Sequence, residues 1–133
     1  MGIEPGLVNE SKITVTPDMT AEASNIVGMA PVLSTPKLIS FLERTAHLTV
    51  FSLLAEGQST VGTLVNVRHL AATPVGMEVR FRAELVKVDR RRLRFKVEAW
   101  DAVDKICEGE HERFIIDQAR FMANLEKKTK QTN

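Results

Sequence analysis

Three residues of this 133-residue chain stand out as candidates for nucleophilic or acid–base chemistry: Thr35, Glu43 and His69. His69 lies in the stretch NVRHLAATPVG, where an extended run ends just before Pro74 and Gly76. An imidazole changes charge near neutral pH and can exchange a proton with a carboxylate or a hydroxyl group. An exposed turn histidine is the commoner interpretation of such a position. His69 therefore has a chemical role only if the fold brings partners to it.

Glu43 lies in the middle of a predicted helix, within the sequence STPKLISFLERTAHLTVFSLL. Apolar residues extend around most of that helix, so we expect most of its surface to be buried. A carboxylate is seldom buried without a partner. Glu43 either lies at a solvated edge of the helix, paired with Lys37, Arg44 or His47, or belongs to a functional site.

Thr35 lies at the start of the same helix, next to Pro36. Either Ser34 or Thr35 can supply the hydroxyl group that caps a helix N-terminus, and on this evidence alone capping is the expected role of Thr35. Eight residues separate Thr35 from Glu43, which is about 12 Å along an ideal helix. A site that contains both needs a bent entry loop, intervening water and substrate, or a contribution from a second protomer.

Other combinations of residues point to other chemistry. Glu43 and His47 have an i, i+4 spacing and with His69 can form a mononuclear metal site, but a fuller ligand pattern is absent and we expect no metal. The basic segment DRRRLR, residues 89–94, is typical of a solvated hairpin turn, or it can contact the phosphates of an anionic cofactor. Without interleaved aromatic residues it does not indicate nucleic-acid binding. We expect His111, in GEHERF, to be structural.

The elements that must position these residues follow from the hydrophobic periodicity. A short strand at 12–16 and a mixed, irregular segment at 18–30 precede the long helix, which ends near Gly57. The period then changes to two, and the sequence predicts four strands and a closing amphipathic helix or tail, at 59–69, 77–88, 93–101, 105–117 and 118–128. We expect the polar C-terminal end to fray. This order predicts an α+β fold in which an antiparallel sheet wraps around a long helix.

Composition limits the function classes. Net charge is +1, with 18 basic and 17 acidic residues, so no global field favours nucleic acid or a membrane. No apolar run is long enough to span a bilayer. The single cysteine, Cys107, excludes an internal disulfide and a cysteine-based zinc site. The start of the chain has no secretory pattern, and we expect one domain over 1–133, with a core at about 10–125, in the cytoplasm.

Four ordered blocks resemble the fluoroacetyl-CoA thioesterase-like family of hotdog-fold proteins. They are VLSTPKLISFLERTAH, TVGTLVNVRHLAATPVGMEV, VDRRRLRFKVEAWD and GEHERFIID, within residues 10–125. The resemblance implies a hotdog fold, a homodimer or a higher oligomer, and active sites at the interface between protomers. It also implies an acyl-CoA substrate and no cofactor, because coenzyme A is part of the substrate.

The same resemblance implies roles for individual residues. The catalytic threonine, glutamate and histidine of the family correspond to Thr35, Glu43 and His69. The glycine whose backbone N–H approaches the acyl group corresponds to Gly62, and an arginine near the substrate pocket corresponds to Arg113.

Two positions depart from the family pattern. The aromatic lid before the catalytic threonine is replaced by Gly28-Met29-Ala30-Pro31, so we expect no strong fluoroacetyl selectivity. A glycine often found in the hairpin turn is replaced by Arg90.

The predicted function is hydrolysis of a small acyl-CoA thioester to free acid and CoA. Glu43 would be a base or transient nucleophile, His69 would tune Glu43 or transfer a proton, Thr35 would attack or position water, and the Gly62 N–H would stabilise the thioester oxygen. Two alternatives remain: a hotdog hydratase or dehydratase acting on acyl thioesters, and a non-enzymatic acyl-CoA-binding module.

Overall fold

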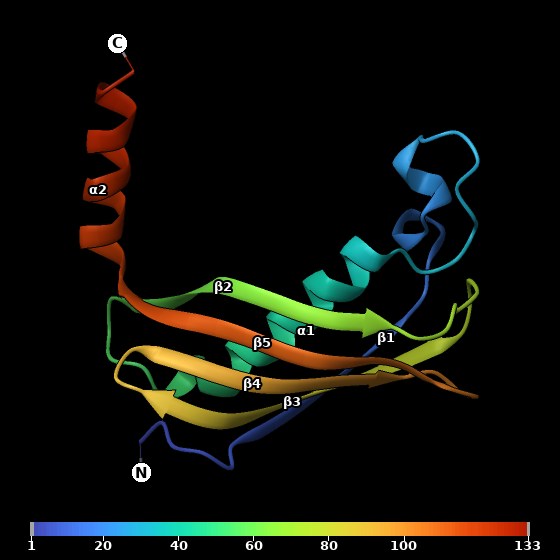
Figure 1. The fold of residues 1–133 in the computed structure, drawn as a ribbon, viewed down its shortest axis with the longest axis horizontal. Coiled ribbons are helices and arrows are strands. Elements are labelled where there is room, and N and C mark those ends of the chain that lie inside the picture. Colours follow the sequence, from blue (N-terminus) through green and yellow to red (C-terminus); the bar gives the residue numbers. More distant parts are fainter. Residues whose placement is uncertain (1, 133) are drawn as a thin grey trace.

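The computed structural model describes residues 2–132, which form one antiparallel sheet folded around a central helix (Figure 1). The strands are β1 (Val8–Thr14), β2 (Gln58–His69), β3 (Glu78–Asp89), β4 (Arg92–Trp100) and β5 (Lys105–Asp117), and the helices are α1 (Thr35–Val50) and α2 (Gln118–Lys130). Three short 3-10 helices, Pro17–Met19, Glu22–Ser24 and Phe51–Leu53, lie before and after α1. This architecture confirms the predicted α+β class.

The order of strands in the sheet is β1-β3-β4-β5-β2, with every neighbouring pair antiparallel. Strands β1 and β2 are therefore the two edges, although β2 follows α1 directly in the chain. Residues alternate between buried and exposed along β3 and β4, as the period of two predicts. Phe81, Leu85 and Phe95 face α1 and are fully buried, while the outer face carries charged side chains.

Burial around α1 is narrower than the sequence predicts. Its buried face consists of residues at i, i+4 and i+7 spacing: Leu38, Leu42, Thr45, Ala46, Thr49 and Val50. Leu48 and Phe51, expected to be covered, are 47% and 45% exposed. The prediction of all-round burial was wrong for this protomer because a single sheet contacts only one side of the helix.

The C-terminal segment forms a helix slightly longer than the amphipathic element predicted at 118–128. Helix α2 continues to Lys130, and its N-cap Asp117 accepts a hydrogen bond from the backbone N–H of Arg120 at 3.2 Å. Lys127, Lys128 and Lys130 lie in the last turn, where positive charge interacts favourably with the helix dipole. Capping and these charges favour the helix, which the sequence left open as an amphipathic helix or a tail.

Candidate active site

Thr35 and His69 meet where α1 begins and β2 ends. The Thr35 hydroxyl and His69 Nδ1 are 2.8 Å apart, within hydrogen-bonding distance. Ser34, not Thr35, is the N-cap of α1, and its hydroxyl accepts from the backbone N–H of Lys37 at 3.2 Å. The capping role expected for Thr35 is therefore wrong: its neighbour satisfies the helix end and leaves the Thr35 hydroxyl free to reach the imidazole.

The far side of the His69 ring has no partner among the described residues. Its Nε2 atom is buried and makes no hydrogen bond there. Burial lowers the pKa of His69 below its usual value, and a contact with the Ala71 backbone opposes this in part. The ring is therefore mainly neutral near pH 7. If Nδ1 accepts the Thr35 hydroxyl proton, the ring proton must lie on Nε2, which then needs an acceptor.

Glu43 lies in a second cluster, with Gly62 and Arg113. Arg113 Nη1 donates to Glu43 Oε2 at 3.3 Å, and 39% of the Glu43 side chain is exposed. A β-carbon added to Gly62 would lie only 2.6 Å from the same carboxylate oxygen. Glycine at position 62 thus lets the Glu43 carboxylate lie directly against the backbone of β2.

Arg113 is held in place by a buried network. Its Nε donates to Thr60 Oγ1 at 2.7 Å and its Nη2 to the Thr60 carbonyl at 3.1 Å. Thr60 Oγ1 also lies 2.6 Å from His47 Nδ1, within hydrogen-bonding distance. Arg113 Nη1 also lies 3.2 Å from His111 Nε2. The guanidinium therefore presents a fixed cation to Glu43.

A β-bulge in β2 sets the two clusters on one face of the sheet. Gly62 pairs with Arg113 and Leu64 pairs with Glu112, so Thr63 is the extra residue between them. Gly62 and His69 are seven positions apart, an odd number that would direct them to opposite faces of a regular strand. The extra residue corrects the alternation, and both face α1.

One protomer brings together some of the predicted residues but not all of them. Thr35 contacts His69, and Glu43 contacts Arg113 beside Gly62, but no hydrogen bond joins Glu43 to Thr35 or His69. Glu43, His47 and His69, the residues considered for a metal site, are not brought together either, and His47 hydrogen-bonds to Thr60. Across residues 2–132, no group of three or more histidine, cysteine or acidic side chains is arranged to hold a metal ion.

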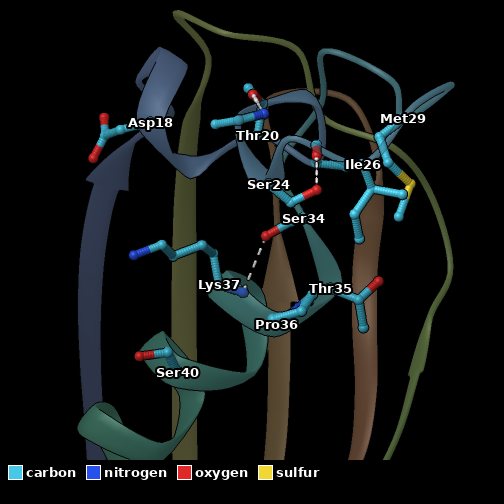
Figure 2. A pocket seen from close by; sticks show the side chains of 12 residues that line it. Asp18, Thr20, Ser24, Ile26, Met29, Ser34, Thr35, Pro36, Lys37 and Ser40 are labelled. Carbon is cyan, nitrogen blue, oxygen red and sulfur yellow. Dashed lines mark hydrogen bonds between the residues drawn. The ribbon is translucent and has the colours of Figure 1, made fainter.

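A pocket of about 720 Å³ opens beside Thr35, between α1 and the segment 18–29. Figure 2 shows Ile26 and Met29 above the start of α1 on the side of Thr35, with Lys37 and Ser40 on the other side. Met29, in the stretch that lacks the aromatic lid, lines this pocket and is 42% exposed. The pocket has an apolar wall next to the Thr35 hydroxyl group.

Comparison with known proteins places the chain in a family. The family model described as "Fluoroacetyl-CoA-specific thioesterase" matches residues 15–119. This chain belongs to that family. A fluoroacetyl-CoA thioesterase of Streptantibioticus cattleyicolor is 35% identical over 108 residues, which cover 81% of this chain and 78% of the relative.

Solved structures agree with this assignment. The fluoroacetyl-CoA thioesterase FlK matches with a TM-score of 0.90 at 32% identity, over 96% of this chain and 98% of FlK. A thioesterase superfamily member of Thermus thermophilus matches with a TM-score of 0.91 at 28% identity, over 97% and 95% of the two chains. A hot-dog-like protein of Thermanaerovibrio acidaminovorans, 18% identical with a TM-score of 0.86 over 93% and 91%, shares the fold. The predicted family, hotdog fold and thioesterase class are confirmed.

Sequence reasoning missed the role of Thr60 and assigned His111 no place in the site. Thr60 gave no signal, because a threonine in a strand is ordinary. His111 gave a signal: it belongs to the buried phase of the alternation in β5, two positions before Arg113, so its polar ring faces the core.

Within residues 2–132, the helices α1 and α2 and the short 3-10 helices are all too short or too polar to cross a membrane.

Proposed function

We propose that this thioesterase hydrolyses a small acyl-CoA to the free acid and CoA, with Thr35, Glu43 and His69 as catalytic residues. The observation that carries the proposal is the 2.8 Å contact between the Thr35 hydroxyl and His69 Nδ1. A hydroxyl group hydrogen-bonded to a mainly neutral imidazole is the arrangement that activates a nucleophile or a water molecule. Acyl-CoA as substrate is supported by structures of FlK variants with fluoroacetate and CoA and with acetyl-CoA.

The proposed site is completed by a second copy of the chain. Strand β2 is twelve residues long, lies at an edge of the sheet, and carries the exposed apolar residues Leu64 and Val65. Such an edge is a template for pairing with another strand. A two-fold axis at Asn66 would pair Leu64 with Arg68 of the other copy. The buried faces of the two β2 strands would then lie on the same side of the joined sheet. The bulge beside Gly62 would then lie opposite His69 of the second protomer.

This pairing supplies the groups that one protomer lacks. Glu43 of one copy would approach the buried Nε2 of His69 in the other, the atom that needs an acceptor. The Gly62 N–H would hydrogen-bond to the thioester oxygen as negative charge develops on it, and Arg113 would fix Glu43. Thr35, or a water molecule that it holds, would attack the carbonyl, and His69 would carry the proton to the departing thiolate of CoA. The reaction needs no metal or further cofactor.

Mixed dimers test the shared site. A chain with Thr35→Ala and a chain with Glu43→Gln should each be inactive, with a loss of about 10²- to 10⁴-fold. Co-expressed with separate affinity tags, the heterodimer should regain up to about half of wild-type turnover, because one of its two sites combines both intact residues. A heterodimer as inactive as its parents would refute a site shared between protomers.

A cysteine pair tests the register. Asn66→Cys should give a disulfide between protomers on mild oxidation, because residues at a two-fold axis of antiparallel strands lie directly opposite. Arg68→Cys, four positions from its own counterpart in this register, is the matched control and should stay reduced. The native Cys107 is buried. A disulfide in Arg68→Cys and none in Asn66→Cys would place the two-fold axis elsewhere in β2.

Release of free CoA separates this function from its alternatives. A thiol-release screen over short, branched, aromatic and halogenated acyl-CoAs should give turnover with saturated substrates, which a hydratase or dehydratase does not hydrolyse. A binding module would bind acyl-CoA without releasing thiol at any pH. Because the stretch Gly28-Met29-Ala30-Pro31 has no aromatic lid residue, we propose that fluoroacetyl-CoA is not strongly preferred over acetyl-CoA. A preference of several orders of magnitude would contradict this.

A further inference from the structure

His111 connects the two groups that shape the Glu43 cluster. It lies on β5 with only 1% of its surface exposed. One ring nitrogen, Nε2, lies 3.2 Å from Arg113 Nη1, and the other, Nδ1, lies 2.8 Å from the Leu64 carbonyl oxygen. Arg113 is the residue that contacts Glu43, and Leu64 is the residue that closes the bulge after Gly62.

The two contacts fix the state of the ring. A guanidinium can only donate, so His111 Nε2 must be the acceptor, and the ring proton must lie on Nδ1 and be donated to the Leu64 carbonyl. A neutral ring satisfies both contacts at once, whereas a protonated ring would direct a donor at Arg113. Burial, the main cause, lowers the pKa of His111.

We propose that His111 is a positioning residue that holds the Arg113 guanidinium against Glu43 and, through Leu64, fixes the β2 bulge that presents Gly62. This inference rests on the proposed function, because it assigns His111 to the geometry of that reaction. His111 hydrogen-bonds to Arg113 and to the Leu64 carbonyl, and makes no hydrogen bond to Glu43, Thr35 or His69. It acts through Arg113 and through β2.

Other residues restrict Arg113 only in part. Thr60 holds the Nε and Nη2 side of the guanidinium, leaving Nη1 between Glu43 and His111. Without an acceptor at position 111, Nη1 loses the contact that stops it from tilting. A misplacement of about 1 Å in a catalytic group can cost on the order of 100-fold in rate. The effect should therefore be on kcat more than on KM.

Two substitutions of similar size separate positioning from packing. His111→Leu fills the volume but removes both hydrogen bonds, and should lower kcat roughly 10- to 100-fold. His111→Gln can place its amide oxygen near the position of Nε2, so it keeps an acceptor for Arg113 and should retain about tenfold more kcat than the leucine variant. Val97→Ala, a buried substitution on β4 outside the network, controls for loss of stability. Turnover is measured per folded molecule, with circular dichroism on the same samples.

A double-mutant cycle gives a readout that a purely structural histidine would not change. In an Arg113→Lys background the guanidinium contact is already lost and only the Leu64 contact of His111 remains, so the further loss caused by His111→Leu should be smaller than the loss that it causes alone. Multiplicative losses would overturn the proposal, as would wild-type kcat in folded His111→Leu. Equal losses in the leucine and glutamine variants would also overturn it. Wild-type thiol release is measured first and reports on the proposed function alone, so failure of the two proposals is distinguishable.

Discussion

Gly62→Ala should remove most of the activity while leaving the fold intact. The added β-carbon would lie 2.6 Å from Glu43 Oε2, and 3.3 Å from both Arg113 Nη1 and His111 Cε1. The backbone at this position is not in the left-handed region, so alanine adds no backbone strain. The whole perturbation therefore acts on the Glu43 carboxylate and the groups that hold it.

The size of the effect follows from the contact distance. Ordinary contacts of a β-carbon begin near 3.4 Å, so the carboxylate must retreat by about 0.8 Å. A displacement of about 1 Å in a catalytic group costs on the order of 100-fold in rate, or about 2.7 kcal/mol in transition-state free energy. The free energy of unfolding should change by less than ~1 kcal/mol, because the end of a partly exposed side chain moves at little cost.

Gly109→Ala is the matched control. Its added β-carbon would collide with the Asn66 carbonyl oxygen and lie 2.7 Å from Val67 Cα, and backbone atoms cannot retreat as a side chain can. Gly109→Ala should therefore lower the melting temperature, whereas Gly62→Ala should lower kcat for acetyl-CoA hydrolysis at an unchanged melting temperature. A Gly62→Ala protein with kcat within about threefold of wild type would refute the role of the Glu43 position.

Three further predictions concern other parts of the molecule. Thr35→Ser should keep substantial turnover, and Thr35→Ala should lose most of it. The melting temperature of Thr35→Ala should not change, because the preceding serine is the helix cap. A loss of ~1 kcal/mol in stability with normal turnover would instead assign Thr35 a capping role. Arg90 adopts a φ of 60° in the β3–β4 turn, so Arg90→Gly should stabilise the protein by about 1 kcal/mol in urea unfolding, and a destabilisation would contradict this. Burial lowers the pKa of His47, His69 and His111, so the unfolded chain binds more protons just below pH 6.5. The free energy of unfolding should be at its full value above pH 6.5 and should decline as the pH falls from 6.5 to the lowered pKa values, where the decline from these groups ends; a gain in stability over that range would refute the assigned neutral states.

The sequence alone determined the order of elements and most of their bounds. The first strand, predicted at 12–16, is Val8–Thr14, and the helix predicted to end near Gly57 ends at Val50, followed by the 3-10 helix Phe51–Leu53. Alternation with a period of two in β3, β4 and β5 and the i, i+4, i+7 spacing in α1 are local properties, and they are visible without the fold. The identity of His69 and Glu43 as unusual residues was also visible, because an imidazole before two alanines and a carboxylate on an apolar helix both need an explanation.

Tertiary structure decided which residues meet. Which hydroxyl group is available to contact His69 depends on which of two adjacent residues caps α1. In the folded helix the cap is Ser34. Exposure of Leu48 and Phe51 depends on how far one sheet extends around the helix, which periodicity within α1 does not specify.

The bulge at Thr63 shows most clearly what the sequence alone does not specify. A strict alternation along β2 would send Gly62 and His69 to opposite faces, and nothing in GTLVNVRH marks the extra residue. Its position depends on pairing with β5, where the buried His111 donates to the Leu64 carbonyl within the bulged segment. Pairing across 47 positions of the chain is a property of the folded sheet, because the hydrogen bonds that define a register exist only between strands.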